Sequence, residues 1–216
     1  MQYMQNTSDA STINYYNLNA KSYFSSTVNV DMSACYERFT KYLKPGDSII
    51  DIGAGSGRDI KYFVKCGFNV EGIDASTELC KLASDYTGVK VKCCTIEEWR
   101  PEKKYSGVWA NASLLHLPLE DINIFIQHLP EILSDEGVLF LSFKENLCEG
   151  IDEFGRYFNG LSVDIINNAL SIGKEFSILE NWVSKDELLR TKIRWRNIVI
   201  GKKKMYMILK AKGIWN

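Results

Sequence analysis

The stretch Ser48–Asp59, SIIDIGAGSGRD, constrains the fold of this chain more than any other. It begins with an apolar, β-branched run, interrupted only by Asp51, which is typical of a strand buried on both faces. Glycines follow at positions 53, 55 and 57, and a helix-compatible segment comes directly after them. Glycine tolerates positive φ and lets a ligand approach the backbone. A strand, a glycine turn and a helix together direct free N–H groups at a ligand, so the stretch predicts a site for a nucleotide-like cofactor.

Strand-like and helix-like segments alternate along most of the chain. This alternation predicts a Rossmann-like, doubly wound α/β fold with helices on both faces of a mostly parallel sheet. No convincing crossover helix separates the last two strands, so we expect them to pair antiparallel. A long helix over 119–133 should kink at Pro130, and 145–159 reads as a loop. The expected strands are 47–52, 69–73, 89–94, 106–112, 137–143, 176–183 and 192–200.

The chain of 216 residues contains no linker rich in Pro, Gly or Ser, which predicts one domain over residues 1–216. Residues 1–12 are polar and read as disordered. We expect 13–45 to form a helical lid, whereas the tail 202–216 is basic and apolar together and has no clear place in the fold.

Composition narrows the functional class. The apolar fraction is 45% and the net charge is −1, so no global basic field favours nucleic acid or a membrane surface. No apolar run is long enough for a membrane span, and the start lacks a signal core, so a cytoplasmic protein is expected. The six cysteines form no C-x-x-C pair and only two histidines occur, which argues against a metal site.

The glycine spacing departs from the dinucleotide fingerprint G-x-G-x-x-G, because Arg58 occupies its last position when counted from Gly53. A second mark is Asp74, which ends the next predicted strand. Its distance from Gly57 suits an acid that binds ribose hydroxyls, and we favour this over an acid that only stabilises a helix N-terminus.

The glycine turn and Asp74 are both found in the class I S-adenosylmethionine-dependent methyltransferases, which the chain resembles. The run IIDIGAGSG resembles their first motif and GIDAS their second. Ser106–Pro118, SGVWANASLLHLP, is similar to the fourth-strand motif of their small bacterial members, a group that includes proteins of tellurite resistance. The resemblance covers about residues 13–200 and implies a seven-stranded sheet with a reversed last strand.

The resemblance also implies S-adenosyl-L-methionine as cofactor and S-adenosyl-L-homocysteine as product. The methionine part should lie near the glycine turn, the ribose at Asp74 and the adenine beyond it. Thr95 stands where many members have an acid for the adenine amino group, so the N–H of Ile96 and the carboxylate of Glu97 are expected to replace it. The expected cofactor-binding residues are Asp51, Gly53, Ala54, Gly55, Gly57, Asp74, Ala75, Ser76, Thr95, Ile96, Glu97, Asn111 and Ala112.

Methyl transfer from a sulfonium is an in-line displacement that needs alignment and desolvation but no covalent residue. His116 follows the fourth strand, and an unperturbed pKa near 6.5 would let it accept a substrate proton. The alternative is a histidine that only bonds within its loop.

The sequence gives fewer indications of the residues that bind the methyl acceptor. Tyr16 and Tyr23 are expected to close over the sulfonium by cation–π attraction, or else to pack the first helix onto the sheet. Arg156 offers a forked donor for a carboxylate or phosphate, or else forms a surface ion pair. The expected substrate-binding residues are Tyr16, Tyr23, Ser113, His116, Arg156 and Tyr157.

These marks predict a methyltransferase acting on a small molecule through O, N, S or a metalloid. Two alternatives stay open. The first is methylation of tRNA, which the tail lysines support and the overall charge opposes. The second is a regulator that binds the cofactor without turnover.

Overall fold

The computed structural model describes residues 7–188 and 193–204. Seven strands form one sheet in the order β3-β2-β1-β4-β5-β9-β8. β1 (Ser48–Ile52), β2 (Asn69–Asp74), β3 (Val91–Cys93), β4 (Tyr105–Asn111) and β5 (Leu133–Lys144) are parallel neighbours. β9 (Arg194–Lys202) runs antiparallel to both β5 and β8 (Phe176–Lys185). The predicted fold class, including the antiparallel last strand, is confirmed.

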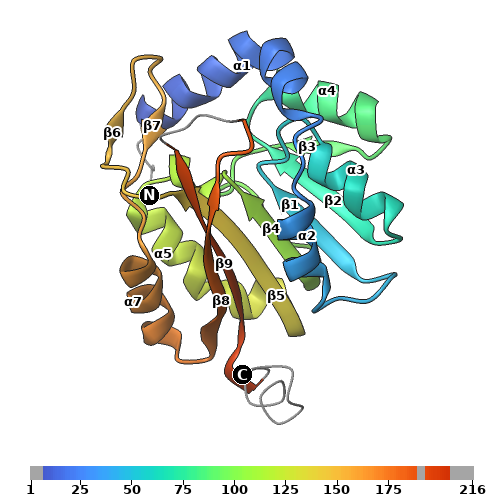
Figure 1. Cartoon of the computed structure of the whole chain (residues 1–216), viewed down its shortest axis with the longest axis vertical. Coiled ribbons are helices and arrows are strands. Elements are labelled where there is room, and N and C mark those ends of the chain that lie inside the picture. Colours follow the sequence, from blue (N-terminus) through green and yellow to red (C-terminus); the bar gives the residue numbers. More distant parts are fainter. Residues whose placement is uncertain (1–6, 189–192, 205–216) are drawn as a thin grey trace.

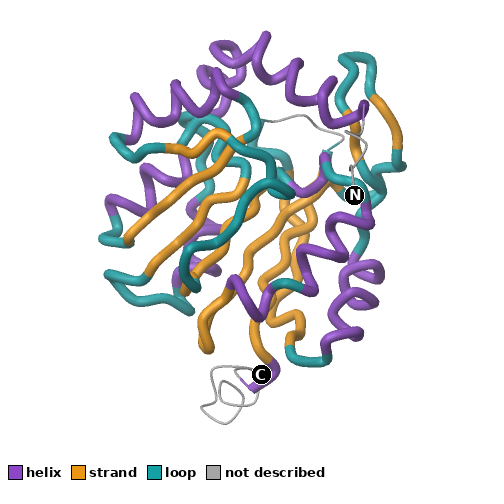
Figure 2. The backbone as a smooth tube through the Cα atoms, turned by 180° about the vertical axis from the view of Figure 1, so that it is seen from behind, coloured by secondary structure: helices purple, strands orange, loops and turns teal. Residues whose placement is uncertain are grey.

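Helices cover both faces of the sheet (Figures 1 and 2). Phe39 of α2 (Ser33–Thr40) and Phe63 of α3 (Arg58–Lys65) pack with Trp109 and Phe140 on one face. The other face is covered by α5 (Leu119–Gln127), the single turn α6 (Leu129–Ile132) and α7 (Val163–Gly173). α4 (Thr77–Thr87) packs with α3 near the β3 edge.

Strands β1, β4 and β5 are central, and their side chains are buried on both faces. Trp109 stacks on Phe140 with ring centroids 3.9 Å apart, and both side chains are fully buried. The aliphatic residues that alternate with them along the same strands face α5 and α7. This two-sided burial is the physical reason for the continuous apolar runs in the sequence.

The first helix lies across the carboxyl ends of the strands (Figure 1). α1 spans Thr7–Thr27, so the prediction of disorder is wrong for residues 7–12, while residues 1–6 lie outside the described part. The sequence lacks an apolar signal there because this helix packs through tyrosines and small polar residues. Lys202 ends β9 and pairs with Asp135 and Glu175, whereas most of the predicted tail, 205–216, is outside the described residues.

Two further expectations need correction. The helix predicted over 119–133 ends at Gln127, and α6 follows as a separate turn, because Pro130 has no N–H to continue the ladder. The segment predicted as a loop contains a small hairpin, β6 (Gly150–Ile151) with β7 (Tyr157–Phe158). The hairpin lies beside the N-terminal half of α1, as Figure 1 shows.

Candidate active site

The glycine turn after β1 forms the floor of the site. Gly53 and Gly55 have φ of 75° and 55°, values that favour glycine. A Cβ on Gly53 would lie 2.4 Å from the Cβ of Ser113, and one on Gly55 would lie 3.2 Å from the ring of Tyr23. Both glycines line the cavities described below. The turn therefore has room for a ligand only because these positions lack side chains.

Gly57 has a different role from the one predicted. Its φ is 74° and it precedes α3, but it is not among the residues that line either cavity. A Cβ there would lie 2.8 Å from Thr87 Cγ2 and 3.1 Å from Ala83 Cβ, both on α4. The third glycine thus lets two helices approach closely and does not reach the candidate cofactor cavity.

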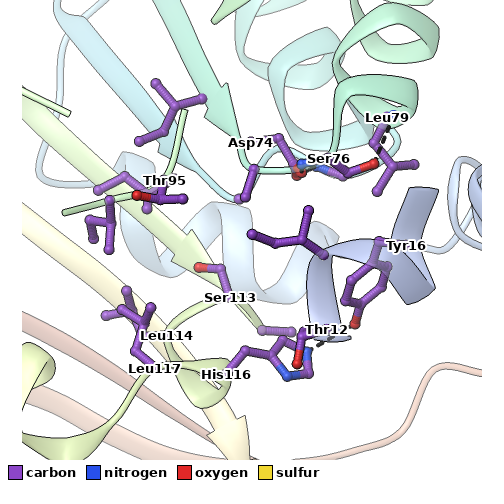
Figure 3. Close-up of a pocket in the computed structure, with 18 of the residues that line it drawn as sticks. Thr12, Tyr16, Asp74, Ser76, Leu79, Thr95, Ser113, Leu114, His116 and Leu117 are labelled. Carbon is purple, nitrogen blue, oxygen red and sulfur yellow. Dashed lines mark hydrogen bonds between the residues drawn. The ribbon is translucent and has the colours of Figure 1, made fainter. Parts of the chain in front are cut away.

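Asp74 closes the turn from the end of β2. Its two carboxylate oxygens accept hydrogen bonds from the N–H groups of Gly55 and Ser76, each at 2.8 Å. Burial raises the pKa of Asp74, and these two bonds oppose the rise. Each carboxylate oxygen still has one lone pair for a ligand, so the geometry suits a vicinal diol. Figure 3 shows the Asp74–Ser76 segment at the cavity wall.

The far end of the cavity is formed by the loop after β3. The Thr95 hydroxyl accepts from the Glu98 N–H at 3.3 Å, and the Glu98 carboxylate accepts from the Thr95 N–H at 3.2 Å. These reciprocal bonds resemble a capping box on the turn 96–98, and they leave the proton of the Thr95 hydroxyl for a ligand. Thr95, Ile96 and Glu97, which were expected near the adenine, all line the cavity.

Two buried oxygens near the glycine turn lack partners among the described residues, Asp51 Oδ2 and Ser113 Oγ. Burial, and then the nearby charge of Asp59, raises the pKa of Asp51 well above its usual range. Unpartnered buried oxygens are costly, and they are typical of a site that a polar ligand completes. A donor such as an ammonium group satisfies an oxygen of this kind.

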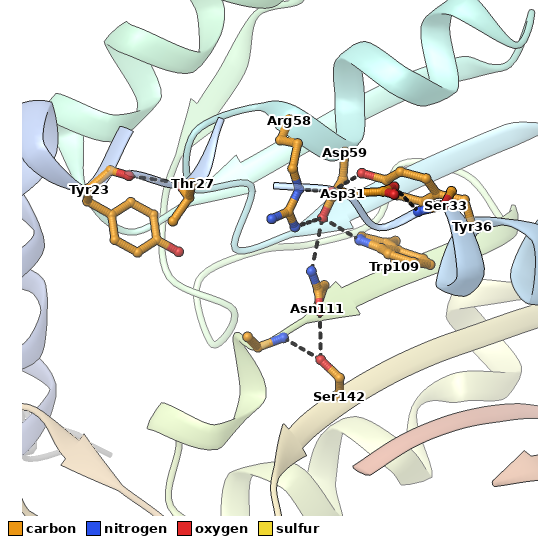
Figure 4. Close-up of polar contacts among 11 residues, drawn as sticks. Tyr23, Thr27, Asp31, Ser33, Tyr36, Arg58, Asp59, Trp109, Asn111 and Ser142 are labelled. Carbon is orange, nitrogen blue, oxygen red and sulfur yellow. Dashed lines mark hydrogen bonds and ion pairs between the residues drawn. The ribbon is translucent and has the colours of Figure 1, made fainter. Parts of the chain in front are cut away.

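A buried carboxylate organises the wall between α2, α3 and β4 (Figure 4). Asp59 accepts from the Tyr36 hydroxyl, from Arg58 Nε at 2.6 Å and from Trp109 Nε1 at 2.7 Å. Burial opposes its ionisation, but Arg58 and the other donors hold the pKa of Asp59 below its usual value. Neither Arg58 nor Asp59 was predicted as a site residue, although both line the second cavity.

The end of β4 is fixed by the Ser142 hydroxyl. It donates to Asn111 Oδ1 at 2.7 Å and accepts from the Ala112 N–H at 2.9 Å, while Asn111 Nδ2 donates to Asp59 at 3.3 Å. Ala112 has φ of 54°, which is unfavourable for a residue with a Cβ. Such strain persists where surrounding bonds enforce it, and it is common at functional sites.

The site consists of two adjoining cavities, of about 150 and 220 Å³. The first lies between α1 and the ends of β1, β2, β3 and β4 (Figure 3), and we call it the cofactor chamber. The second extends towards α2, β8 and β9 and is called the acceptor chamber. Residues common to both are Tyr16, Tyr23, Gly53, Gly55, Asn111, Ala112 and His116.

Most predicted site residues meet in these chambers. Ile52, Ile73 and Leu117 add apolar wall to the cofactor chamber. Ala54 lines only the acceptor chamber, and Asp51 lies behind the turn without lining either one. The cofactor chamber is lined by residues expected to bind the cofactor, Gly53, Gly55, Asp74, Ala75, Ser76, Thr95, Ile96, Glu97, Asn111 and Ala112, and also by residues expected on the substrate side, Tyr16, Tyr23, Ser113 and His116.

His116 lies at the junction of the chambers and forms two hydrogen bonds. Its Nε2 is 2.9 Å from the Tyr16 hydroxyl, and its Nδ1 is 2.6 Å from the Tyr157 carbonyl oxygen. Burial lowers the pKa of His116 to about 4, although the carbonyl bond opposes the fall. The assumption of an unperturbed pKa near 6.5 is therefore wrong.

Two predicted substrate residues have partners within the protein. Arg156 forms a forked ion pair with Asp152, at 2.9 and 2.7 Å, and lines the acceptor chamber. The Tyr157 side chain donates to Glu149 at 2.8 Å and lines neither chamber. The contribution of Tyr157 is its carbonyl, which periodicity cannot reveal.

The lid helix α1 forms hydrogen bonds to the rest of the protein through residues that were not predicted from the sequence. The Thr12 hydroxyl accepts from the Tyr157 N–H at 2.9 Å, and the Ser11 hydroxyl donates to the Gly155 carbonyl at 2.8 Å. Asn17 accepts from the Ser76 hydroxyl at 2.7 Å. α1 is thus joined to the hairpin at one end and to α4 in its middle. Polar residues of this kind give no sequence signal before the partner is known.

Neither a metal nor a membrane span is indicated. Across residues 7–188 and 193–204, no three His, Cys, Asp or Glu side chains are grouped so as to hold a metal ion. Within the same ranges, no helix has the length and apolar character needed to cross a bilayer.

The strand order, the glycine turn and the acid after β2 define the fold of a class I methyltransferase. Residues 24–170 match the methyltransferase domain family, and the chain belongs to that family. The predicted family is thereby confirmed, while the narrower likeness to the tellurite-resistance group stays a prediction.

Relatives and solved structures agree with this assignment. A ubiquinone biosynthesis O-methyltransferase of Paramagnetospirillum magneticum is 28% identical over 113 residues, and the match covers 49% of this chain and 45% of that protein. The chain thus matches about half the length of this relative. The 1,6-didemethyltoxoflavin-N1-methyltransferase of Burkholderia thailandensis, solved with its substrate and S-adenosylhomocysteine, superposes with a TM-score of 0.70 at 17% identity, covering 94% and 92% of the two chains. Magnesium protoporphyrin IX methyltransferase of Synechocystis PCC 6803, solved with S-adenosylmethionine, superposes with a TM-score of 0.67 at 16% identity, and the match covers 94% of this chain and 100% of that chain.

Proposed function

We propose that this protein is an S-adenosyl-L-methionine-dependent methyltransferase that acts on a small-molecule acceptor. The observation that carries the proposal is the pair of adjoining chambers. One has the polar groups expected of a nucleoside site, and the other is a separate cavity that meets it at Tyr16 and His116. The relatives support the same reaction, because they are named for O-methylation in ubiquinone biosynthesis and for methylation of 1,6-didemethyltoxoflavin and of magnesium protoporphyrin IX.

The residues present fit this cofactor. In the proposed complex, Asp74 accepts from the ribose hydroxyls, and the loop Thr95–Glu97 with Leu117 surrounds the adenine. Gly53 and Gly55 leave space for the methionine part, and the unpartnered hydroxyl of Ser113, which lines the cofactor chamber, is available to its ammonium group. When bound, the cofactor supplies an activated methyl group on a sulfonium.

The chain's own contribution is to align the acceptor and exclude water. α1 covers the cofactor chamber, and Tyr16 and Tyr23 border both chambers. Desolvation by burial raises the pKa of both hydroxyls, so they stay protonated at neutral pH. Their rings present the electron-rich surfaces that attract a sulfonium.

The acceptor chamber combines aromatic and charged walls. Phe158, Trp182 and Trp195 line it, together with Arg58, Lys144 and Arg156. Aromatic walls suit a planar acceptor, which would match the ring-shaped substrates of the relatives. Acids line the same chamber, and Arg58 and Arg156 are paired with Asp59 and Asp152, so the charges of the wall do not select an acidic or a basic substituent.

Calorimetry with S-adenosylmethionine, S-adenosylhomocysteine and NAD tests the cofactor. We expect saturable heat with the first two and none with NAD, and Asp74→Asn should weaken binding whereas the exposed Asp85→Asn on α4 should not. Absence of heat with S-adenosylmethionine contradicts the proposal.

Turnover is tested by release of S-adenosylhomocysteine over a panel of phenols, amines and thiols. Binding without turnover on any acceptor would favour a cofactor-binding regulator. Steeply salt-dependent binding of tRNA would favour the RNA alternative. Lys202 and Lys204, two of the lysines behind that alternative, lie near Asp135, at 2.8 and 3.9 Å.

A further inference from the structure

A directional chain of hydrogen bonds runs from the hairpin to the lid through His116. It starts at the Tyr157 carbonyl in β7, passes through both imidazole nitrogens and ends at the Tyr16 hydroxyl in α1. Figure 3 shows the Tyr16 hydroxyl directed at His116. The two side chains also pack edge-on, with ring centroids 5.5 Å apart. Both border the cofactor and the acceptor chamber.

The chemistry of the two ends fixes every proton in this chain. A carbonyl oxygen has no hydrogen, so Nδ1 of His116 must carry the proton of the 2.6 Å bond to Tyr157. A neutral imidazole then has a lone pair on Nε2, which accepts from the Tyr16 hydroxyl at 2.9 Å.

The charged groups around His116 keep it neutral. Burial is the largest effect, and the positive charges of Arg156 and Lys144 further disfavour an imidazolium, while the Asp152 carboxylate acts weakly in the other direction. Asp152 is already paired with Arg156. At neutral pH the imidazole therefore remains a hydrogen-bond acceptor towards Tyr16.

The only proton of the Tyr16 hydroxyl is therefore used in the hydrogen bond to His116 Nε2. Towards the chambers the Tyr16 oxygen offers no donor, and of its two lone pairs one is used by the nearby Arg156 guanidinium and one remains for a ligand. We propose that the Tyr16 oxygen, held by His116, is a hydrogen-bond acceptor that selects a methyl acceptor presenting an O–H or N–H group. This inference rests on the proposed function and narrows its substrate class to a protic nucleophile. A thiolate, a phenolate or a tertiary amine has no proton to donate there and is disfavoured.

The same chain would orient the acceptor for the reaction. Burial and the charges of Arg156 and Lys144 oppose an imidazolium, so His116 does not store the proton that the reaction releases. The Tyr16 oxygen would hold the acceptor through its O–H or N–H group, and the proton would leave to water once the acceptor atom has taken the methyl group. Tyr16 is then the residue that contacts substrate, and His116 is a positioning residue that acts through it.

The first test reads the imidazole protons directly and needs no cofactor. The chain has only two histidines, so nitrogen-15 NMR of a His128→Gln protein reports His116 alone. We expect a neutral ring with a proton on Nδ1 and none on Nε2 at pH 7. Tyr16→Phe should shift the Nε2 resonance, whereas Tyr15→Phe, the neighbouring tyrosine of α1, should leave it in place. A proton on Nε2 at pH 7 overturns the proposal.

The second test uses phenol and anisole, which differ by the hydroxyl proton, as probes in the presence of S-adenosylhomocysteine. We expect phenol to bind about fivefold more tightly than anisole, the ratio typical of one net hydrogen bond. Tyr16→Phe should abolish the preference and Tyr15→Phe should preserve it. An equal affinity of the wild-type protein for both probes overturns the proposal.

The two failures are distinguishable. Loss of S-adenosylmethionine binding contradicts the proposed function but leaves the NMR result valid as a property of the site. An imidazole in the other tautomer contradicts the inference even if the protein methylates a substrate.

Discussion

Asn17 of the lid helix accepts a hydrogen bond from the Ser76 hydroxyl, with 2.7 Å between the two oxygens. Ser76 also caps α4, because its hydroxyl accepts from the Leu79 N–H at 3.2 Å. One side chain therefore joins the start of α4, the segment next to Asp74 and the middle of α1. This contact, together with the bond from the Glu78 N–H to the same Asn17 oxygen at 3.3 Å, links the position of the lid to the wall of the cofactor chamber.

Asn17→Ala should weaken binding of S-adenosylmethionine by about five- to tenfold, since a net hydrogen bond contributes roughly 1 kcal/mol. Amide hydrogens of α1 should also exchange faster. The matched control is Asn19→Ala, because Asn19 bonds only to the Tyr15 carbonyl of its own helix. Calorimetry and hydrogen exchange measure both effects, and equal affinities for the two variants would contradict the role of Asn17.

Asp74→Asn should reduce cofactor affinity by roughly tenfold or more, because hydrogen bonds to a charged group are worth about 1.5–3 kcal/mol. An amide cannot accept from both Gly55 and Ser76, so its nitrogen would face one of these N–H groups. We therefore expect a lower Tm as well. A variant that retains wild-type affinity would show that Asp74 only holds the turn.

Gly57→Ala should destabilise the protein without a direct effect on the cofactor. The new Cβ meets Thr87 and Ala83, in addition to the cost of positive φ, for a total of about 2–4 kcal/mol. Gly88→Ala is the matched control, because Gly88 has φ of 77° but no atom within 4 Å of its Cβ position. The control should lose only about 1–2 kcal/mol. Thermal unfolding separates the two, and equal losses would contradict the helix-packing role.

Asp51→Asn should stabilise the protein at neutral pH. The pKa of Asp51 is raised in the folded state, mainly by burial, so folding takes up a proton at any pH between its usual 3.8 and the raised value. Wild-type stability falls as pH rises through that window. The variant lacks this slope, so its advantage in Tm should grow from pH 4 towards neutrality. An advantage that does not change with pH would contradict the raised pKa.

His116→Gln should change stability in the opposite pH direction. The pKa of His116 is lowered from 6.5 to about 4 in the folded protein, so the unfolded chain binds a proton first as pH falls. This contribution to the free energy of unfolding of the wild-type protein is fully present above pH 6.5. It decreases as the pH falls towards 4, by about 3 kcal/mol at most. The variant should retain this stability, whereas His128→Gln, at an exposed site, is the control. Chemical unfolding at pH 7 and pH 4.5 measures the difference.

Much of the cofactor side follows from local sequence. A buried strand, glycines at alternate positions and an acid after the second strand require only neighbouring residues to be recognised, and the structure brings Gly53, Gly55 and Asp74 to one cavity. The reciprocal bonds of Thr95 and Glu98 are equally local, although only the structure shows that the Thr95 hydroxyl accepts from the Glu98 N–H.

The position of Gly57 shows that a sequence motif does not fix the role of each glycine within it. The third glycine belongs to the same sequence pattern as the other two, yet its neighbours are Thr87 and Ala83 on a later helix. Spacing along the chain cannot distinguish a glycine that admits a ligand from one that admits a helix. That distinction depends on packing between elements.

The sequence by itself determined the fold class and the family, because these depend on local patterns of burial and turn chemistry. Only the tertiary structure decided the state of His116, the pairing of Arg156 with Asp152 and the link from Tyr157 to Tyr16. These groups are far apart in the chain, and their protonation depends on burial and on neighbours from other elements. Electrostatic environment is a property of the assembled fold, so the acceptor side of the site emerges only when the hairpin, the lid and the sheet are in place.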